Sequence, residues 1–288
     1  MIGNFIGVLF DGIAYGSLLF IISIGLSVTM GLMNFVNLAH GAFAMVGGYA
    51  CVLAMSRLGV PFLATLPLAF IVSAAVGAVL ERTLYRRLYR ATHLDQVLFS
   101  IGLVFISIAA TTYAFGSQQQ PVQLPSFLRG QVHVLGLDLG TYRLFLIAVV
   151  VVVTLALTWL IEFTRFGAQI RASVDNQQAA AGLGVNVERV FSLTFALGSG
   201  LAGLGGGLGI DVLGLEPTFP LKYMVYFLLV VAVGGAGTIT GPLVAALILG
   251  VFDVAGKYYV PQVGSFIIYV LMVVMLILFP RGLMGRRV

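Results

Sequence analysis

Charged residues are scarce in this 288-residue chain, since they make up 9% of it while apolar residues make up 60%. Soluble domains carry about 25% charged residues, so a chain this poor in charge cannot coat a globule in water with polar groups. The composition excludes soluble, disordered and fibrous proteins and predicts an integral membrane protein. An internal disulfide is also excluded, because Cys51 is the only cysteine.

Catalytic and nucleotide-binding patterns are missing as well. The sequence has no H-E-x-x-H, no cysteine pair for zinc and no G-x-x-x-x-G-K-[ST] loop for a nucleotide phosphate. A G-x-G-x-x-G match at 198–203 lies inside an apolar run and continues into Gly205, Gly206 and Gly207. We interpret it as close helix packing through small residues. We therefore expect no catalytic residue, no bound metal and no cofactor in this chain.

Long apolar runs are abundant instead. About 20 apolar residues cross the hydrocarbon core as a helix, and continuous rather than alternating apolar runs favour helices over a barrel. We predict an all-α polytopic protein with about nine transmembrane or re-entrant helices, and eight or ten remain open. The expected spans lie near 12–31, 36–56, 61–80, 97–116, 143–161, 190–210, 223–236, 241–256 and 265–280.

The basic residues predict the orientation. Ten of the 15 Lys and Arg residues lie in 81–96, 162–189 and 281–288, and such connections are retained in the cytoplasm. An even number of crossings must then separate the second basic segment from the third, so the glycine-rich stretch 234–242 is expected to be a turn or a re-entrant dip. The N-terminus lies outside and the C-terminus inside. The loop 117–142, with a hairpin around Gly136, is then extracytoplasmic, and residues 1–288 form one transmembrane domain.

The segment 162–189 is the largest one predicted to be cytoplasmic. Its centre, Gln169–Gly184, is rich in alanine and predicts a helix that Gly167 precedes and that Gly182 and Gly184 end. Such a helix can lie along the membrane surface and present one face to a soluble partner. The alternative is a solvated linker.

Two further polar groups lie at the ends of apolar runs. Asn34, Asn37 and His40 fall between the first two spans, where they either line a solute path in a broken helix or form a tight turn that caps the next helix. Asp11 is expected to cap the start of the first span, where a carboxylate is favoured by the helix dipole.

Three stretches in sequence order, and the chain's ending, resemble one family. They are FDGIAYGSLLFIISIGLSVTMGLMNFVNLAHGAFAMVGGYA (10–50), TRFGAQIRASVDNQQAAAGLGVNVERVFSLTFALGSGLAGLGG (164–206), VAVGGAGTITGPLVAALILG (231–250) and FPRGLMGRR (279–287). Together they resemble the LivH-type permease subunits of branched-chain amino-acid ABC importers.

The resemblance implies an ABC importer permease fold in the bacterial inner membrane and half of a path for branched-chain or other hydrophobic amino acids. It implies a second homologous permease, two cytoplasmic ATPase subunits that use the ATP, and an extracytoplasmic solute-binding protein. The family's ATPase-coupling residues match Gly167, Arg171, Ala172, Asp175, Asn176, Ala180 and Gly184. Its path-side residues match Asn34, Asn37, His40 and Gly41.

Other functions stay open at this stage. Many relatives have a polar residue where this chain has Ala42, and related permeases carry urea, short amides, or aromatic and organic acids. A stand-alone secondary transporter or channel is a rival of another class. The near absence of buried acids argues against proton or sodium coupling, and the lack of a convergent nucleophile or acid–base pair argues against a membrane enzyme.

Overall fold

The computed structural model describes residues 2–33, 35, 37–89, 91–134, 137–279 and 282–284. Within them, seven helices are long and apolar enough to cross a membrane, and two further helices, α10 and α12, are apolar but shorter. The prediction of an all-α polytopic protein is confirmed. The nine helices are α1 (Ile2–Met33), α2 (His40–Leu58), α3 (Phe62–Leu80), α5 (His93–Phe115), α6 (Thr141–Phe163), α9 (Val187–Leu213), α10 (Phe219–Gly234), α11 (Thr240–Tyr259) and α12 (Gly264–Leu278).

Helix α9 forms the centre of the bundle. Of the residues in its apolar 18-residue stretch, 78% are buried, and it packs against α1, α2 and α3. In the corresponding stretches of α5 and α6 only 11% and 17% of the residues are buried, so the apolar surfaces of these two helices face outward from the bundle. This difference identifies α9 as the core helix and α5 and α6 as helices that lipid or another membrane subunit can cover.

Glycines let α9 approach its neighbours at backbone distance. A Cβ added at Gly206 would lie 1.9 Å from the carbonyl oxygen of Ala44 in α2, and one at Gly47 would lie 2.3 Å from Gly203. On the other side, a Cβ at Gly25 of α1 would lie 2.2 Å from the Gly198 carbonyl oxygen. The interpretation of 198–207 as a packing seam is confirmed.

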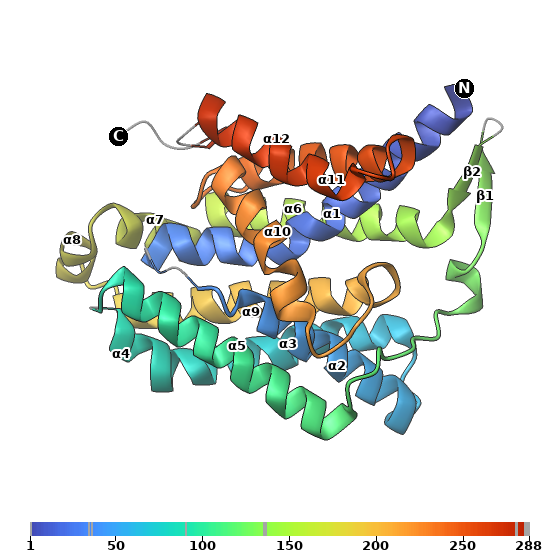
Figure 1. Ribbon diagram of the computed structural model, residues 1–288. Coiled ribbons are helices and arrows are strands. Elements are labelled where there is room, and N and C mark those ends of the chain that lie inside the picture. Colours follow the sequence, from blue (N-terminus) through green and yellow to red (C-terminus); the bar gives the residue numbers. More distant parts are fainter. Residues whose placement is uncertain are drawn as a thin grey trace.

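The connecting segments separate into two ends (Figure 1). The start of α1 and the hairpin of β1 (Gln131–Val134) and β2 (Leu137–Gly140) lie at one end. The helices α4 (Arg86–Leu88), α7 (Arg165–Asp175) and α8 (Gln177–Gly182) lie at the other. The hairpin prediction is confirmed, with Gly136 outside the described residues, and two basic connections share one end as expected.

The glycine-rich stretch 234–242 does break the helix, as expected. Helix α10 ends at Gly234 and α11 begins at Thr240. The turn between them packs on the end of α1, where the Gly237 N–H donates to the Ser27 carbonyl oxygen at 3.0 Å. The Leu283 N–H donates to the Val233 carbonyl oxygen at 2.7 Å, which places the end of the described chain beside the same turn.

One local expectation was wrong. Helix α1 begins at Ile2, so Asp11 lies inside it and forms an ion pair with Arg143 of α6 instead of capping a terminus. Helix α3 continues through a π-helical turn, η1 (Glu81–Tyr85), into α4, so the first basic connection is mostly helical. The extra turns place Glu81 inside the protein rather than in a loop. The loop on the hairpin side also contains a short 3₁₀ turn, η2 (Ser126–Leu128).

Candidate functional site: a helical elbow at one end of the bundle

A sharp elbow joins α6 to α7. Thr164 has extended backbone angles, and its hydroxyl accepts from the Gly167 N–H at 3.2 Å and donates to the Leu160 carbonyl oxygen at 2.5 Å. A Cβ added at Gly167 would lie 2.0 Å from the Ile161 carbonyl oxygen, to which Arg171 donates a hydrogen bond. The structure thus brings Gly167 and Arg171, two of the predicted coupling residues, together on one carbonyl.

The predicted single helix is in fact two. Asn176 adopts an extended conformation, with φ −158° and ψ 105°, and its side chain accepts from the Ala179 N–H at 2.9 Å. Asparagine is a favoured N-cap because its side-chain oxygen satisfies an otherwise unpaired N–H, so it ends α7 and starts α8. Gly167 therefore lies inside α7 rather than before it. The Ala172 carbonyl oxygen accepts from the Asn176 N–H at 3.0 Å and closes the last turn of α7.

Helix α8 folds back toward α9. Its Ala180 is 2% exposed, and the Val185 N–H donates to the Ala180 carbonyl oxygen at 3.0 Å. Gly184 has φ +88°, a conformation that glycine adopts without steric cost, and so reverses the chain. These three residues, Asn176, Ala180 and Gly184, therefore define the shape of the connection.

A small apolar core anchors α7 to the bundle. Ile170 packs with Val190 and Phe191 at the start of α9, and the ring of Tyr89 lies edge-on to Phe191 at 5.8 Å between centroids. By contrast, the tip of the connection is exposed, including Asp175, Val174 at 39% and Leu183 at 86%. The elbow is therefore fixed at its base and presents its tip to the outside of the bundle.

Of the predicted path-side residues, Asn37, His40 and Gly41 lie in the described part of the chain, and all three are buried. The Asn37 side-chain oxygen accepts from the Ala39 N–H at 3.0 Å and from the Tyr85 hydroxyl at 2.9 Å. His40 lies 2.7 Å from the Ile22 carbonyl oxygen through Nε2, which must carry the proton because a carbonyl can only accept. A Cβ at Gly41 would lie 3.0 Å from Pro220 Cα. Asn34 lies outside the described residues.

The space that Asn37, His40 and Gly41 border in this conformation is too small to admit a water molecule. Met224, Phe227 and Leu228 of α10 close the gap next to Asn37 and His40. Helices α1 and α2 are separate here, as both the solute-path interpretation and the capping-turn interpretation require. The hydrogen bond from Ala39 to Asn37 is the contact that a capping turn predicts, while a solute path requires α10 to move away.

The sequence reasoning missed a buried carboxylate. Glu81 is 0% exposed, accepts from the Tyr89 hydroxyl at 2.6 Å and from the Ser192 hydroxyl, and lies 3.9 Å from the Arg86 guanidinium. Burial and the bond to Glu81 raise the pKa of Tyr89, so its hydroxyl remains a donor. The spacing Glu81, Tyr85, Tyr89 on one helix face was the available signal.

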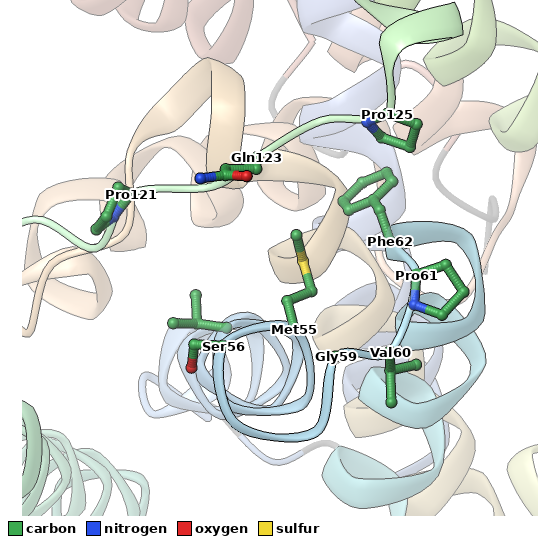
Figure 2. A pocket seen from close by; sticks show the side chains of 10 residues that line it. Met55, Ser56, Gly59, Val60, Pro61, Phe62, Pro121, Gln123 and Pro125 are labelled. Carbon is green, nitrogen blue, oxygen red and sulfur yellow. The ribbon is translucent and has the colours of Figure 1, made fainter.

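The opposite end carries an apolar crevice of about 530 Å³. It lies between the turn joining α2 to α3 and the loop with Pro121, Gln123 and Pro125, and Figure 2 shows Met55 and Phe62 between these two segments. Gln123 is its most polar side chain besides Ser56. This crevice is well separated from the elbow of α6 and α7, which lies at the other end.

Comparison with known proteins identifies the family of this chain. The sequence model described as "Branched-chain amino acid transport system / permease component" matches residues 8–276. The chain belongs to this permease family. The match includes α7, α8 and the residues of the α1–α2 break, so the resemblance noted from the sequence is confirmed over nearly the whole chain.

Full-length relatives have the same description. The chain is 28% identical to LivH of the high-affinity branched-chain amino acid transport system of Salmonella typhimurium, over 98% of this chain and 96% of the relative. It is 27% identical to BraD of Pseudomonas aeruginosa (96% and 95%) and 25% identical to a probable LivH of Methanocaldococcus jannaschii (96% and 92%). No solved structure matches. The chain is thus an integral membrane permease component, and the family that it belongs to is a permease family rather than a catalytic one.

Proposed function

We propose that this chain is the membrane-spanning permease subunit of an ABC importer for branched-chain or other hydrophobic amino acids in a bacterial inner membrane. It forms half of the path, a second homologous permease forms the other half, and a solute-binding protein delivers the cargo from outside. Two ATPase subunits drive the transporter and use the ATP, and the α7–α8 connection is the part of this chain that binds an ATPase subunit, so the chain itself needs no cofactor. The supporting observation is the elbow, which joins a fixed base to an exposed tip.

The elbow is suited to transmit force. Gly167 and Arg171 bond or pack against the Ile161 carbonyl, and Ile170 packs on α9, so displacement of α7 must move α6 and α9 with it. The exposed tip, with Asp175 and Leu183, offers apolar and polar contacts to a partner. In the proposed orientation this tip lies in the cytoplasm.

The test is ATP-driven uptake of radiolabelled leucine by the complete transporter in proteoliposomes. Arg171→Glu removes the donor to Ile161 and should reduce uptake strongly while ATPase subunits remain bound. Arg165→Glu is the matched control, because Arg165 lies exposed in the same helix and has the same charge change. Normal coupled uptake by Arg171→Glu would contradict the coupling role.

A second measurement tests the composition of the complex. Mild detergent purification of the tagged chain from native membranes should recover two ATPase chains and a sister permease. Leucine transport by the purified chain alone, without ATP, would instead identify a secondary transporter or channel and would overturn the proposal.

A further inference from the structure

A crevice of about 380 Å³ lies beside the elbow, and nothing in the coupling role accounts for it. Its walls come from the end of α1, the end of α6, the outer half of α7 and the turn between α10 and α11. Pockets for small ligands begin at about 300 Å³, so this space suits a small molecule. Residues from all four segments line the crevice, so an occupant would touch all of them.

The lining combines opposite charges with an apolar wall. Arg171 supplies a guanidinium, which has five N–H donors, and the Ile161 carbonyl engages its Nη1 only. Glu162 supplies a carboxylate that forms no ion pair within the described part of the chain. Val28, Val174 and Ile239 supply aliphatic surface.

From this lining we propose that the crevice binds a zwitterionic amino acid with an aliphatic side chain. The ligand carboxylate pairs with Arg171, its ammonium pairs with Glu162, and its side chain contacts Val28, Val174 and Ile239. Charge-assisted hydrogen bonds at both ends of one small molecule set its orientation, and the apolar wall selects its side chain.

A regulatory role follows if the proposed function and orientation hold. The crevice then opens at the inner end, where it meets the cargo only after release. A bound amino acid contacts α7 and the α10–α11 turn together, so it favours the conformation in which they are close and opposes their separation. The crevice is thus an inhibitory site for accumulated product.

Direct binding tests the site without requiring transport. Binding of L-leucine to the purified full chain in detergent is measured by equilibrium dialysis, and Glu162→Gln should weaken it by about tenfold, equivalent to about 1.4 kcal/mol. Glu188→Gln, an exposed acid at the same end but outside the crevice, should bind as the unmodified chain does. Equal affinities in all three proteins, or no binding to any of them, would overturn the proposal.

Ligand analogues test each contact. 4-Methylpentanoate lacks the ammonium and isoamylamine lacks the carboxylate, so both should compete at least about tenfold less well than leucine. O-phosphoethanolamine represents the headgroup of a zwitterionic lipid. Competition by it that matched leucine would show a lipid site and would overturn the amino-acid assignment.

Inhibition is tested in proteoliposomes that contain the complete transporter. Unlabelled leucine in the lumen should slow ATP-driven uptake by the unmodified transporter, whereas Glu162→Gln should start at the same rate and lose this sensitivity. Equal inhibition of both proteins, or of neither, would refute the inhibitory role. If no uptake occurs at all while leucine still binds in dialysis, the proposed function fails and the binding site stands.

Discussion

The glycine seam of α9 makes a quantitative prediction with an internal control. A Cβ at Gly206 would lie 1.9 Å from the Ala44 carbonyl oxygen and 2.5 Å from its carbon. Ordinary contact begins at 3.4 Å, so α2 and α9 must separate by about 1.5 Å. Overpacking of this kind lowers the free energy of unfolding by about 1–3 kcal/mol. We expect the upper part of that range, because the contact joins two backbones and no flexible side chain can move aside.

The matched control is the same substitution at Gly102 in α5. A Cβ there meets nothing within 4 Å, so Gly102→Ala should gain about 0.5–1 kcal/mol from the lower entropy of alanine in the unfolded chain. The free energy of unfolding is measured for both variants by titration with sodium dodecyl sulfate in mixed micelles, followed by circular dichroism. If Gly206→Ala is as stable as the unmodified chain, or if Gly102→Ala loses as much, the packing argument is wrong.

Three further predictions follow from named contacts. Glu81→Ala leaves the Tyr89 and Ser192 hydroxyls without an acceptor and should cost about 1–3 kcal/mol for each in the same titration, whereas Glu81→Gln should cost less. Asp11→Asn should change the free energy of unfolding by at most about 1 kcal/mol, because its pair with Arg143 is partly exposed, and a larger loss would contradict this account. In intact cells, a cysteine placed at exposed Asn176 should resist an impermeant maleimide, whereas one placed at exposed Gln118 should react. The native Cys51 should not react because it is buried. Labelling of Asn176→Cys would show that the predicted membrane orientation is the wrong way round.

The helices were predictable because their signal is local. Each apolar run contains its own information about length, and the breaks at 234–242 and at the hairpin contain glycine or turn residues within a few positions. The seam at 198–207 was predictable for the same reason, since small residues at helical spacing fit only close packing. Even the break at Asn176 had a local signal, because Asp and Asn are favoured at helix starts.

The remaining features depend on residues distant in sequence. The carboxylate of Glu81 is buried beside Ser192, 111 residues later, and Asp11 lies inside α1 and pairs with Arg143, 132 residues later. Hydropathy places both acids at the edges of apolar runs and cannot supply these partners. The elbow is similar, since the contact of Arg171 with Ile161 requires α7 to fold back on α6.

The closed state of the path-side residues can be related to the elbow through one helix. Glu81 and Tyr85 are the first and last residues of η1; Glu81 bonds toward Tyr89 and α9, and Tyr85 bonds to Asn37 at the α1–α2 break. Tyr89 in turn packs on Phe191, which contacts Ile170 of α7. A continuous series of packed and hydrogen-bonded groups therefore connects α7 to Asn37, so a shift of α7 can be transmitted to the α1–α2 break. Single π-helical turns inside α-helices occur frequently at functional sites, so we expect η1 to be the point in this series where the backbone adjusts.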